Sequence, residues 1–505
     1  METSECLTAN RGTSLCAIDA LQDVIILDLR HKKSDNIDFA IDLNKINFLL
    51  SKLKSSGSLW IIANHVNLAD QIKPIGFDIA EYVSRCGLFL RNIITWFIPN
   101  LDNDTERLTS RYSLIYFFVK DVDNYYFDKD SIREKHIWKD VEWGKRNDRY
   151  NPLGKDPGNV WLFIEDDGKG KKTRHIPLSF DQVVFRIKSV ACPQCGSISI
   201  CSSNQMSTDI ANLYPSEEFI IKKAKQLASN IKITTVVKPI KDNHLIYKIF
   251  NKSCENMADL KNEQVDLIVT SPPYWDMKNY NTKEQIGYSE SYELYLSRIK
   301  KVWQECFRVL NKNGTFWLNI NTKLYQKSLQ MIQYDFYKQC VEIGFKLWDI
   351  IIWHKSVSGP APNNNLTDKF EYILVFYKKR GFYFNKLYEK NKIDYLIPSI
   401  NSMGNVWNIN RFWGSIGKNY PHPAMYPDEL IERILHIGTV QGDLVLDPFL
   451  GSGTTMVVSK KLSRACIGYE INSDYFGILN KRIADEKLDD IFHQNDRIQY
   501  IKTNE

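Results

Sequence analysis

Apolar and polar stretches alternate along the second half of the chain in a way that predicts strands and helices in turn. The run "VDLIVT" (265–270) is typical of a buried strand, and "SYELYLSRIKKVWQECFRVL" (291–310) has the period of an amphipathic helix. The same reading predicts strands at 314–320, 346–355, 370–379, 443–449 and 465–471, and helices at 336–345, at 426–438 and after residue 451. This alternation favours an α/β fold, a Rossmann-like doubly wound sheet with helices on both faces.

The first half of the chain repeats this pattern. Five of its segments match segments of the second half in the same order: "GSLWII" with "GTFWLNI", "RNIITWF" with "WDIIIWH", "SLIYFFVK" with "EYILVFYK", "GNVWLF" with "GNVWNI", and "HIPLSFDQVVFRI" with "HPAMYPDELIERI". Trp60 precedes Trp96 by 36 positions, and Trp317 precedes Trp353 by 36 as well. We therefore predict an internal duplication. A degenerate partial copy of the fold would occupy 1–190, a Cys-containing linker 191–244 and the catalytic domain 245–505.

The two copies differ in two loops. The first reads "DVIILDLRHKK" (23–33) where the second reads "VDLIVTSPPYW". After Ile187 the first copy runs into a cysteine-rich stretch, with no counterpart of "DPFLGSGTT". We expect chemistry only where both special loops are present, in the second copy.

Composition and charge narrow the class of protein. The chain has 505 residues, of which 43% are hydrophobic, and a net charge of +6, which permits a nucleic-acid partner without requiring one. "METSECLTAN" lacks the apolar core of a signal peptide, and no apolar run reaches the roughly 18 residues that span a bilayer. We expect a soluble, cytoplasmic protein without a membrane partner.

The ten cysteines form no regular disulfide framework. Cys192, Cys195 and Cys201 in "CPQCGSISIC" have the spacing of a zinc knuckle, but a closed site needs a fourth ligand, and none lies nearby in the sequence. We favour the alternative, a turn with free thiols, and predict no metal.

The segment "DLVLDPFLGSGTT" has the pattern of a ligand-binding turn. A buried strand ends at Asp447, and Gly451 and Gly453 allow the backbone to approach a ligand closely at the start of a helix. Glu470 ends the next strand, 19 residues after Gly451, an offset that suits the hydroxyls of a ribose. No Gly-Lys-Ser/Thr follows, and Met456 holds the third glycine position. The pattern thus indicates a ligand with a ribose and no pyrophosphate, although Gly-x-Gly alone is more often a structural turn.

The segment "TSPPYW" (270–275) ends a strand with two prolines, which fix the backbone. The carbonyl of Pro272 meets no N–H from Pro273 and is available as an acceptor. Together with the Ser271 hydroxyl it can hold an amino group by its two hydrogens, and Tyr274 offers a flat face for stacking. This arrangement suits the exocyclic amine of a nucleobase, whereas a Pro-rich loop without a function is the alternative for this segment taken alone.

The two motifs in one chain resemble those of the β-class amino-methylating DNA methyltransferases of type II restriction–modification systems. "TSPPYW" matches the family's catalytic motif and "DPFLGSGTT" its S-adenosylmethionine motif, and "HPAMYPDELIERIL" matches the helix that precedes the latter. The catalytic motif comes first, which is the order of the β class. The resemblance covers about 245–485.

The resemblance implies a site-specific DNA methyltransferase that moves a methyl group from S-adenosylmethionine to the N4 amine of a cytosine flipped out of duplex DNA, by direct in-line transfer. A Ser at the first position of the tetrapeptide usually goes with cytosine-N4, and an Asp or Asn with adenine-N6. The implied catalytic residues are Ser271, Pro272, Pro273 and Tyr274. The implied cofactor-binding residues are Asp447, Phe449, Gly451, Gly453, Thr454, Glu470, Thr270 and Ser253.

One position departs from the family. Relatives often carry Asn-Gly-Asp-Cys where this chain has "NKSC", so Ser253 stands in the place of an Asp that contacts the cofactor's adenine. The family's target-reading segment corresponds to 379–403, which is short here. We expect the first copy, including the extra segment 121–157, to add DNA contacts and to mimic the second subunit of a dimer, and the alternative is that it is a structural relic.

Two alternatives stay open from the sequence. One is adenine-N6 methylation on the same fold, and the other is a catalytically silent DNA-binding subunit, which should not bind the cofactor. The expected partner is double-stranded DNA, and a restriction endonuclease acting on the same site is compatible with the family. The sequence leaves monomer and homodimer both open.

Overall fold

The computed structural model describes residues 18–30, 43–68, 70–98, 107–108, 110–134, 151–161, 163–166, 173–176, 178–202, 245–276, 278–280, 282, 284–355, 364–385, 404–410, 425, 427–485 and 498–502. We call 18–202 the first half and 245–502 the second half. The linker beyond residue 202, most of the target segment 379–403 and part of the segment 121–157 lie outside the described residues.

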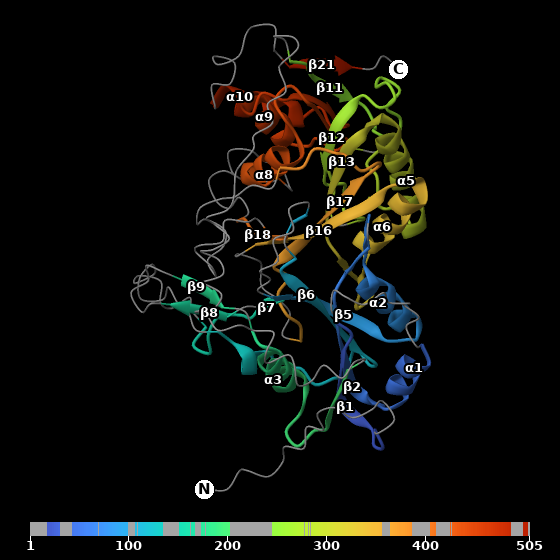
Figure 1. Ribbon diagram of the computed structural model, residues 1–505, viewed down its shortest axis with the longest axis vertical. Coiled ribbons are helices and arrows are strands. Elements are labelled where there is room, and N and C mark those ends of the chain that lie inside the picture. Colours follow the sequence, from blue (N-terminus) through green and yellow to red (C-terminus); the bar gives the residue numbers. More distant parts are fainter. Residues whose placement is uncertain are drawn as a thin grey trace.

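The second half is built on a nine-stranded sheet, drawn in the upper part of Figure 1. Its strand order is β18-β16-β17-β13-β12-β19-β20-β11-β21. Strand β17 is antiparallel to β13 and β16, and the other pairings are parallel. The bounds are β11 (Tyr247–Asn251), β12 (Val265–Thr270), β13 (Leu310–Ile320), β16 (Lys346–His354), β17 (Phe370–Tyr377), β18 (Val406–Asn408), β19 (Leu444–Asp447), β20 (Ala465–Tyr469) and β21 (Gln499–Lys502).

Helices cover both faces of this sheet. In Figure 1, α5 (Tyr292–Val309) and α6 (Ile332–Ile343) lie on one side, and α8 (Asp428–Gly438), α9 (Thr454–Lys461) and α10 (Tyr475–Asp485) lie on the other. Helix α5 starts at the N-cap Ser291 and buries a stripe of apolar side chains at helical spacing, including Tyr295, Ile299 and Trp303. The predicted Rossmann-like α/β fold is confirmed.

The first half is built on a six-stranded sheet of order β10-β1-β2-β6-β5-β7. Its strands are β1 (Gln22–Asp28), β2 (Leu53–Ala63), β5 (Phe89–Phe97), β6 (Tyr112–Val119), β7 (Val160–Trp161) and β10 (Ile198–Ser202). Its helices are α1 (Leu43–Ser51), α2 (Ile75–Arg85), α3 (Phe180–Ala191) and the short 3₁₀-helix η2 (Lys129–Ile132). Two-stranded pairs complete the described strands. In the first half β3 (Val66–Asn67) pairs with β4 (Ile72–Lys73), and β8 (Phe163–Asp166) pairs with β9 (Thr173–Ile176). In the second half β14 (Lys323–Tyr325) pairs with β15 (Ser328–Gln330).

The two sheets agree strand for strand. The order β10-β1-β2-β6-β5-β7 corresponds to β19-β12-β13-β17-β16-β18, with the same parallel and antiparallel neighbours. Strands β5 and β16, each second from the edge of its sheet, share a register shift, between Leu90 and Asn92 in β5 and between Leu347 and Asp349 in β16. These observations fit the predicted duplication.

The boundary of the first unit differs from the expected one at residue 190. Strand β10 lies beyond it and pairs in parallel with β1, in the place that β19 takes beside β12. The stretch expected to be a turn and linker forms a strand because Ile198, Ile200 and Cys201 complete the edge of the first sheet.

The largest hydrophobic core cluster of the described residues spans the two halves. It contains buried residues from both sheets. Phe77 of α2 is fully buried, and its ring lies 5.8 Å from the rings of both Tyr334 and Tyr372 in the second half. The halves therefore pack as one body.

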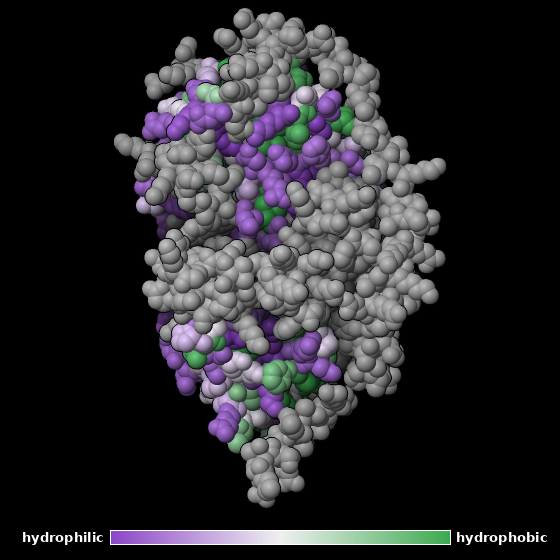
Figure 2. Space-filling model, turned by 90° about the vertical axis from the view of Figure 1, so that its left-hand side faces the viewer, coloured by the Kyte–Doolittle hydropathy of each residue, from purple (hydrophilic) through white to green (hydrophobic). Residues whose placement is uncertain are grey.

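The surface seen from the left-hand side of Figure 1 is mainly hydrophilic where it is described, with smaller hydrophobic areas between (Figure 2). None of the described helices combines the length and the apolar character needed to cross a membrane.

Candidate active site

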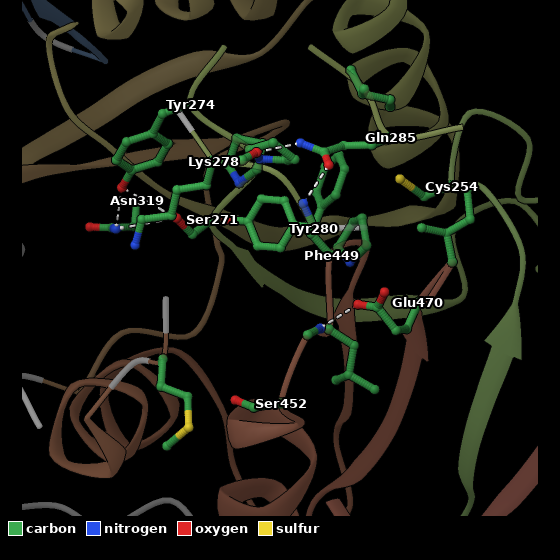
Figure 3. A pocket seen from close by; sticks show the side chains of 18 of the residues that line it. Cys254, Ser271, Tyr274, Lys278, Tyr280, Gln285, Asn319, Phe449, Ser452 and Glu470 are labelled. Carbon is green, nitrogen blue, oxygen red and sulfur yellow. Dashed lines mark hydrogen bonds between the residues drawn. The ribbon is translucent and has the colours of Figure 1, made fainter. Parts of the chain in front are cut away.

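A cavity of about 610 Å³ opens beside the carboxyl ends of β12, β13, β19 and β20. This is the edge of an open α/β sheet at which ligands usually bind. In Figure 3, Ser271, Tyr274 and Asn319 lie on one side of it, Glu470 lies on the other, and Tyr280 and Phe449 lie between. Both predicted motifs thus border a single cavity.

The turn after β19 depends on its two glycines. Gly451 and Gly453 have φ of 53° and 80°, in the left-handed region that favours glycine. A Cβ on Gly453 would lie 2.5 Å from a methyl carbon of Leu479, so a larger residue there would force Leu479 to move. The turn leads directly into α9, and Ser452 and Thr454 at its start line the cavity.

Asp447 lies beneath this turn and shapes it. Its buried carboxylate accepts hydrogen bonds from Thr270 Oγ1 at 2.7 Å, Thr455 Oγ1 at 2.6 Å and the Phe449 backbone N–H at 3.0 Å. Burial raises the pKa of Asp447 to about 6, although these three bonds oppose the rise. Asp447, Gly453 and Thr270 are not among the residues that line the cavity. Their part in ligand binding would therefore be indirect.

Glu470 lies at the end of β20 and lines the cavity. Its carboxylate accepts the Gly451 N–H at 2.7 Å and the Asn472 N–H at 2.8 Å, so it also fixes the glycine turn. Burial raises the pKa of Glu470 to about 7. A carboxylate held in this way retains lone pairs for ligand hydroxyls.

Three further predicted residues line the same part of the cavity: Ser253, Phe449 and Thr454. Ser253 follows β11, and its hydroxyl lies 3.3 Å from Glu255 Oε2. The sequence analysis missed Tyr280, which also lines the cavity. Its N–H donates to Gln285 Oε1 at 2.6 Å, and burial raises the pKa of its phenol to about 12.

The predicted catalytic tetrapeptide borders the cavity with all four residues. The Pro273 carbonyl accepts a hydrogen bond from Tyr295 Oη at 2.7 Å, which anchors the loop to α5. No hydrogen bond from the described residues reaches the Pro272 carbonyl, as predicted from the missing N–H of Pro273.

A buried polar cluster that the sequence analysis missed lies behind Ser271. Tyr274 Oη donates to Glu371 Oε2 at 2.8 Å, and Asn319 Nδ2 lies 2.7 Å from the same oxygen. Lys355, only 1% exposed, forms an ion pair with the other carboxylate oxygen. The signal in the sequence was Glu371 itself, a charged residue within the apolar strand "FEYILVFY".

The Glu371 carboxylate stays ionised although it is buried. Burial alone would raise its pKa, but Lys355, Asn319 and Tyr274 outweigh the burial and hold the pKa at about 2. Asn319 Oδ1 is buried and has no partner among the described residues.

The cysteine stretch does not form a metal centre in the described part of the chain. Cys192 caps the end of α3, Cys201 is buried in β10 and Cys195 is exposed. Burial raises the pKa of Cys192, and it raises that of Cys201 to about 11. No group of three or more His, Cys, Asp or Glu side chains among the described residues is placed to hold a metal ion.

Fold and site together define an α/β protein in which one cavity joins a glycine turn to a proline-fixed loop. The family model described as "DNA methylase" (N6_N4_Mtase) matches residues 39–238 and 265–481. The chain therefore belongs to the N6/N4 DNA methylase family, as its motifs predicted.

Its relatives are type II methyltransferases. The chain is 30% identical over 301 residues to M.MthZI of Methanothermobacter thermautotrophicus, covering 51% of this chain and 82% of that protein. It is 30% identical over 256 residues to M.HpaI of Haemophilus parainfluenzae, covering 50% and 76%. Among solved structures, the PvuII cytosine-N4-specific DNA methyltransferase is 21% identical, with 51% of this chain and 96% of that chain covered and a TM-score of 0.39.

Proposed function

We propose that this DNA methyltransferase moves a methyl group from S-adenosylmethionine to the exocyclic N4 amine of a cytosine in duplex DNA. The observation that carries the proposal is the single cavity, which joins the glycine turn and Glu470 to Ser271–Tyr274. A methyl donor bound at one end and a base held at the other would meet inside it. Direct transfer needs this proximity more than it needs a reactive side chain.

The residues present fit the cofactor. The Glu470 carboxylate would hold its ribose hydroxyls, and Phe449 and Ser253 would flank its adenine. The Gly451 turn lets the backbone approach closely, and Thr454 at the start of α9 would reach the methionine end. When bound, S-adenosylmethionine supplies an electrophilic methyl group on a sulfonium.

The amine site would act by orienting the weakly nucleophilic nitrogen. The Pro272 carbonyl has no partner in the described structure, and together with the Ser271 hydroxyl it would accept the two hydrogens of an exocyclic amine. Accepting both hydrogens turns the nitrogen lone pair toward the methyl group. Ser271 Oγ lies 3.3 Å from Tyr274 Oη, which helps to hold it in place.

The base must leave the duplex to enter this cavity. The half-buried Tyr274 lines its wall and would stack on the flipped base, with its hydroxyl anchored by Glu371. Ser271 at the first position of the tetrapeptide supports cytosine-N4 over adenine-N6, which is the alternative on the same site. A restriction endonuclease that cuts the same sequence is the partner we expect.

The test is methyl transfer from labelled S-adenosylmethionine to plasmid DNA. We expect label in DNA with the wild-type chain and a large loss of label with Ser271→Ala, while calorimetry shows cofactor binding by both. A wild-type chain that binds the cofactor and DNA yet transfers no label would contradict the proposal. A chain that does not bind the cofactor would favour the silent DNA-binding subunit.

A further inference from the structure

The segment 364–369 enters strand β17 and brings two carboxylates to the cavity. Asp368, within the segment, lines the cavity, and so does Glu371 two residues into β17. Asn321 Nδ2 donates to Asp368 Oδ2 at 2.7 Å, which ties the segment to the end of β13. The position of this segment therefore sets the position of cavity-lining groups.

Every residue of this segment is held by the first half of the chain. The Asn364 carbonyl accepts from Tyr125 Oη at 2.6 Å. Asn365 Oδ1 accepts from Asn92 Nδ2 at 2.6 Å, and Asn365 Nδ2 donates to the Arg91 carbonyl at 2.9 Å. Leu366 is 3% exposed and packs into a core cluster that otherwise belongs to the first half.

Residues of the first half also form hydrogen bonds with the last three residues of the segment, 367–369. Thr367 Oγ1 lies 2.6 Å from Asp156 Oδ1, and the Thr367 carbonyl accepts the Asn159 N–H at 2.9 Å. Asn159 Nδ2 lies 3.2 Å from Asp368 Oδ1, and Asn159 Oδ1 accepts the Lys369 N–H at 2.8 Å. Asn159 thus bonds to three consecutive residues, of which the middle one lines the cavity.

The same contact occurs in reverse on the other side of the interface. Asn405, the repeat counterpart of Asn159, accepts the Arg111 N–H at 2.9 Å. Strand β15 contacts β5, and the equivalent β4 contacts β16. Reciprocal contacts between equivalent groups are the mark of a two-fold dimer interface, here formed within one chain.

The reciprocal contact in the first half meets different side chains. In the first half Ser113 pairs with Trp96, at the position where Glu371 pairs with Trp353 in the second. The Arg30 guanidinium lies 4.4 Å from the centre of the Trp96 ring and is bound to Asp28, which ends β1 where Ser271 follows β12. Arg30 thus covers the ring whose counterpart lines the cavity in the second half.

We propose that the first half is a built-in second subunit whose task is to position the active-site segment 364–369, with Asn159 as the central positioning residue. The inference rests on the proposed methyl transfer. It gives the duplicated fold a role in catalysis that does not require DNA contact. Displacing a catalytic group by about 1 Å costs on the order of a hundredfold in rate, so loss of this support should reach the chemistry.

The test compares two buried asparagines in the full-length chain. Asn159 and Asn405 are both 4% exposed, and each bonds across the interface. We expect Asn159→Ala to lower the single-turnover methyl-transfer rate at least about tenfold with an unchanged Kd for S-adenosylmethionine. Asn405→Ala, with a comparable loss of melting temperature, should keep the wild-type transfer rate. Thr367→Val, which removes only the bond to Asp156, should lower the rate less than Asn159→Ala does.

Three results separate the possible failures. Wild-type transfer rates in both Asn159→Ala and Thr367→Val would overturn the positioning role, and if Asn159→Ala does not fold, Thr367→Val decides alone. Equal rate losses in Asn159→Ala and Asn405→Ala would overturn it too, because they would reflect general loosening of the interface. A wild-type chain that transfers no methyl group would instead contradict the proposed function itself.

Discussion

At the scale of single residues, the site depends on one buried charge. Glu371 is ionised although it is buried, because Lys355 and two hydrogen-bond donors surround it. The carboxylate orients Tyr274 through its hydroxyl and Asn319 through its amide.

This arrangement predicts the effect of Glu371→Gln. A glutamine keeps the size but loses the charge, and hydrogen bonds to charged groups contribute about 1.5–3 kcal/mol, or roughly a 10- to 100-fold change in rate. We expect kcat for DNA methylation to fall by that factor while calorimetry shows unchanged cofactor affinity. The exposed surface variant Glu342→Gln serves as the control, and a wild-type kcat in Glu371→Gln would refute the role of the charge.

The raised pKa of Glu470 predicts a pH-dependent cofactor affinity. Above its pKa of about 7 the carboxylate is ionised and accepts from ribose hydroxyls, and below it the group is protonated and loses acceptor capacity. Affinity for S-adenosylmethionine should thus weaken on the order of tenfold from pH 8 to pH 6. Titration calorimetry at both values checks this. Glu470→Gln should bind S-adenosylmethionine more weakly and with the same affinity at both pH values. If the variant shows the same pH dependence as the wild-type chain, a group other than Glu470 causes it.

At the scale of elements, the strands with continuous apolar runs were predictable. The range 265–270 is β12, and the predicted helix 291–310 is α5 within a residue at each end, because burial on one face sets the period of each. Strands β10 and β11 were missed because polar residues interrupt their short sequences, "ISICS" and "YKIFN", so neither has a continuous apolar run.

The site was predictable where one short motif carries it. The tetrapeptide and the glycine turn were found because prolines and glycines mark special backbone. The Glu371 cluster was not, since it joins side chains from β12's loop, β13, β16's end and β17, which only the strand register brings together. Nor does any local pattern show that Asn159 reaches Asp368.

The glycine turn gives a prediction at this scale. Gly442→Ala and Gly453→Ala both place an L side chain at φ near +80°, which costs about 1–2 kcal/mol. Gly453 lies against Leu479, whereas a Cβ on Gly442 meets open space. The free energy of unfolding of Gly453→Ala should therefore fall by a further 1–3 kcal/mol or so, because of overpacking. Urea unfolding gives the two stabilities. Affinity for S-adenosylmethionine should fall for Gly453→Ala and stay unchanged for Gly442→Ala. Equal stabilities and equal cofactor affinities of the two variants would contradict the role of the glycine turn.

At the scale of the whole molecule, two related sheets form one body. The reciprocal contacts across their interface and the core shared through Phe77, Tyr334 and Tyr372 couple them. A chain built in this way carries both halves of a dimer-like unit, but only the second half carries both the proline motif and the glycine turn. We expect it to work as a monomer.

The shared core predicts joint unfolding. Calorimetry should show one cooperative transition, and Phe77→Ala should shift it as a whole, because removing this buried ring costs about 3–5 kcal/mol. The exposed Leu68→Ala, also in the first half, should leave the transition in place. Two separate transitions, of which only one moves in Phe77→Ala, would mean that the halves fold independently.

The measurement that tests the central claim most directly is the identity of the methylated base. Plasmid DNA is incubated with the chain and methyl-labelled S-adenosylmethionine, digested to nucleosides and analysed by mass spectrometry. The account predicts label in N4-methylcytosine and its loss in Ser271→Ala. Label in N6-methyladenine would keep the amine site and change its base, whereas label in 5-methylcytosine, or label that persists in Ser271→Ala, would contradict transfer to an amine held at this cavity.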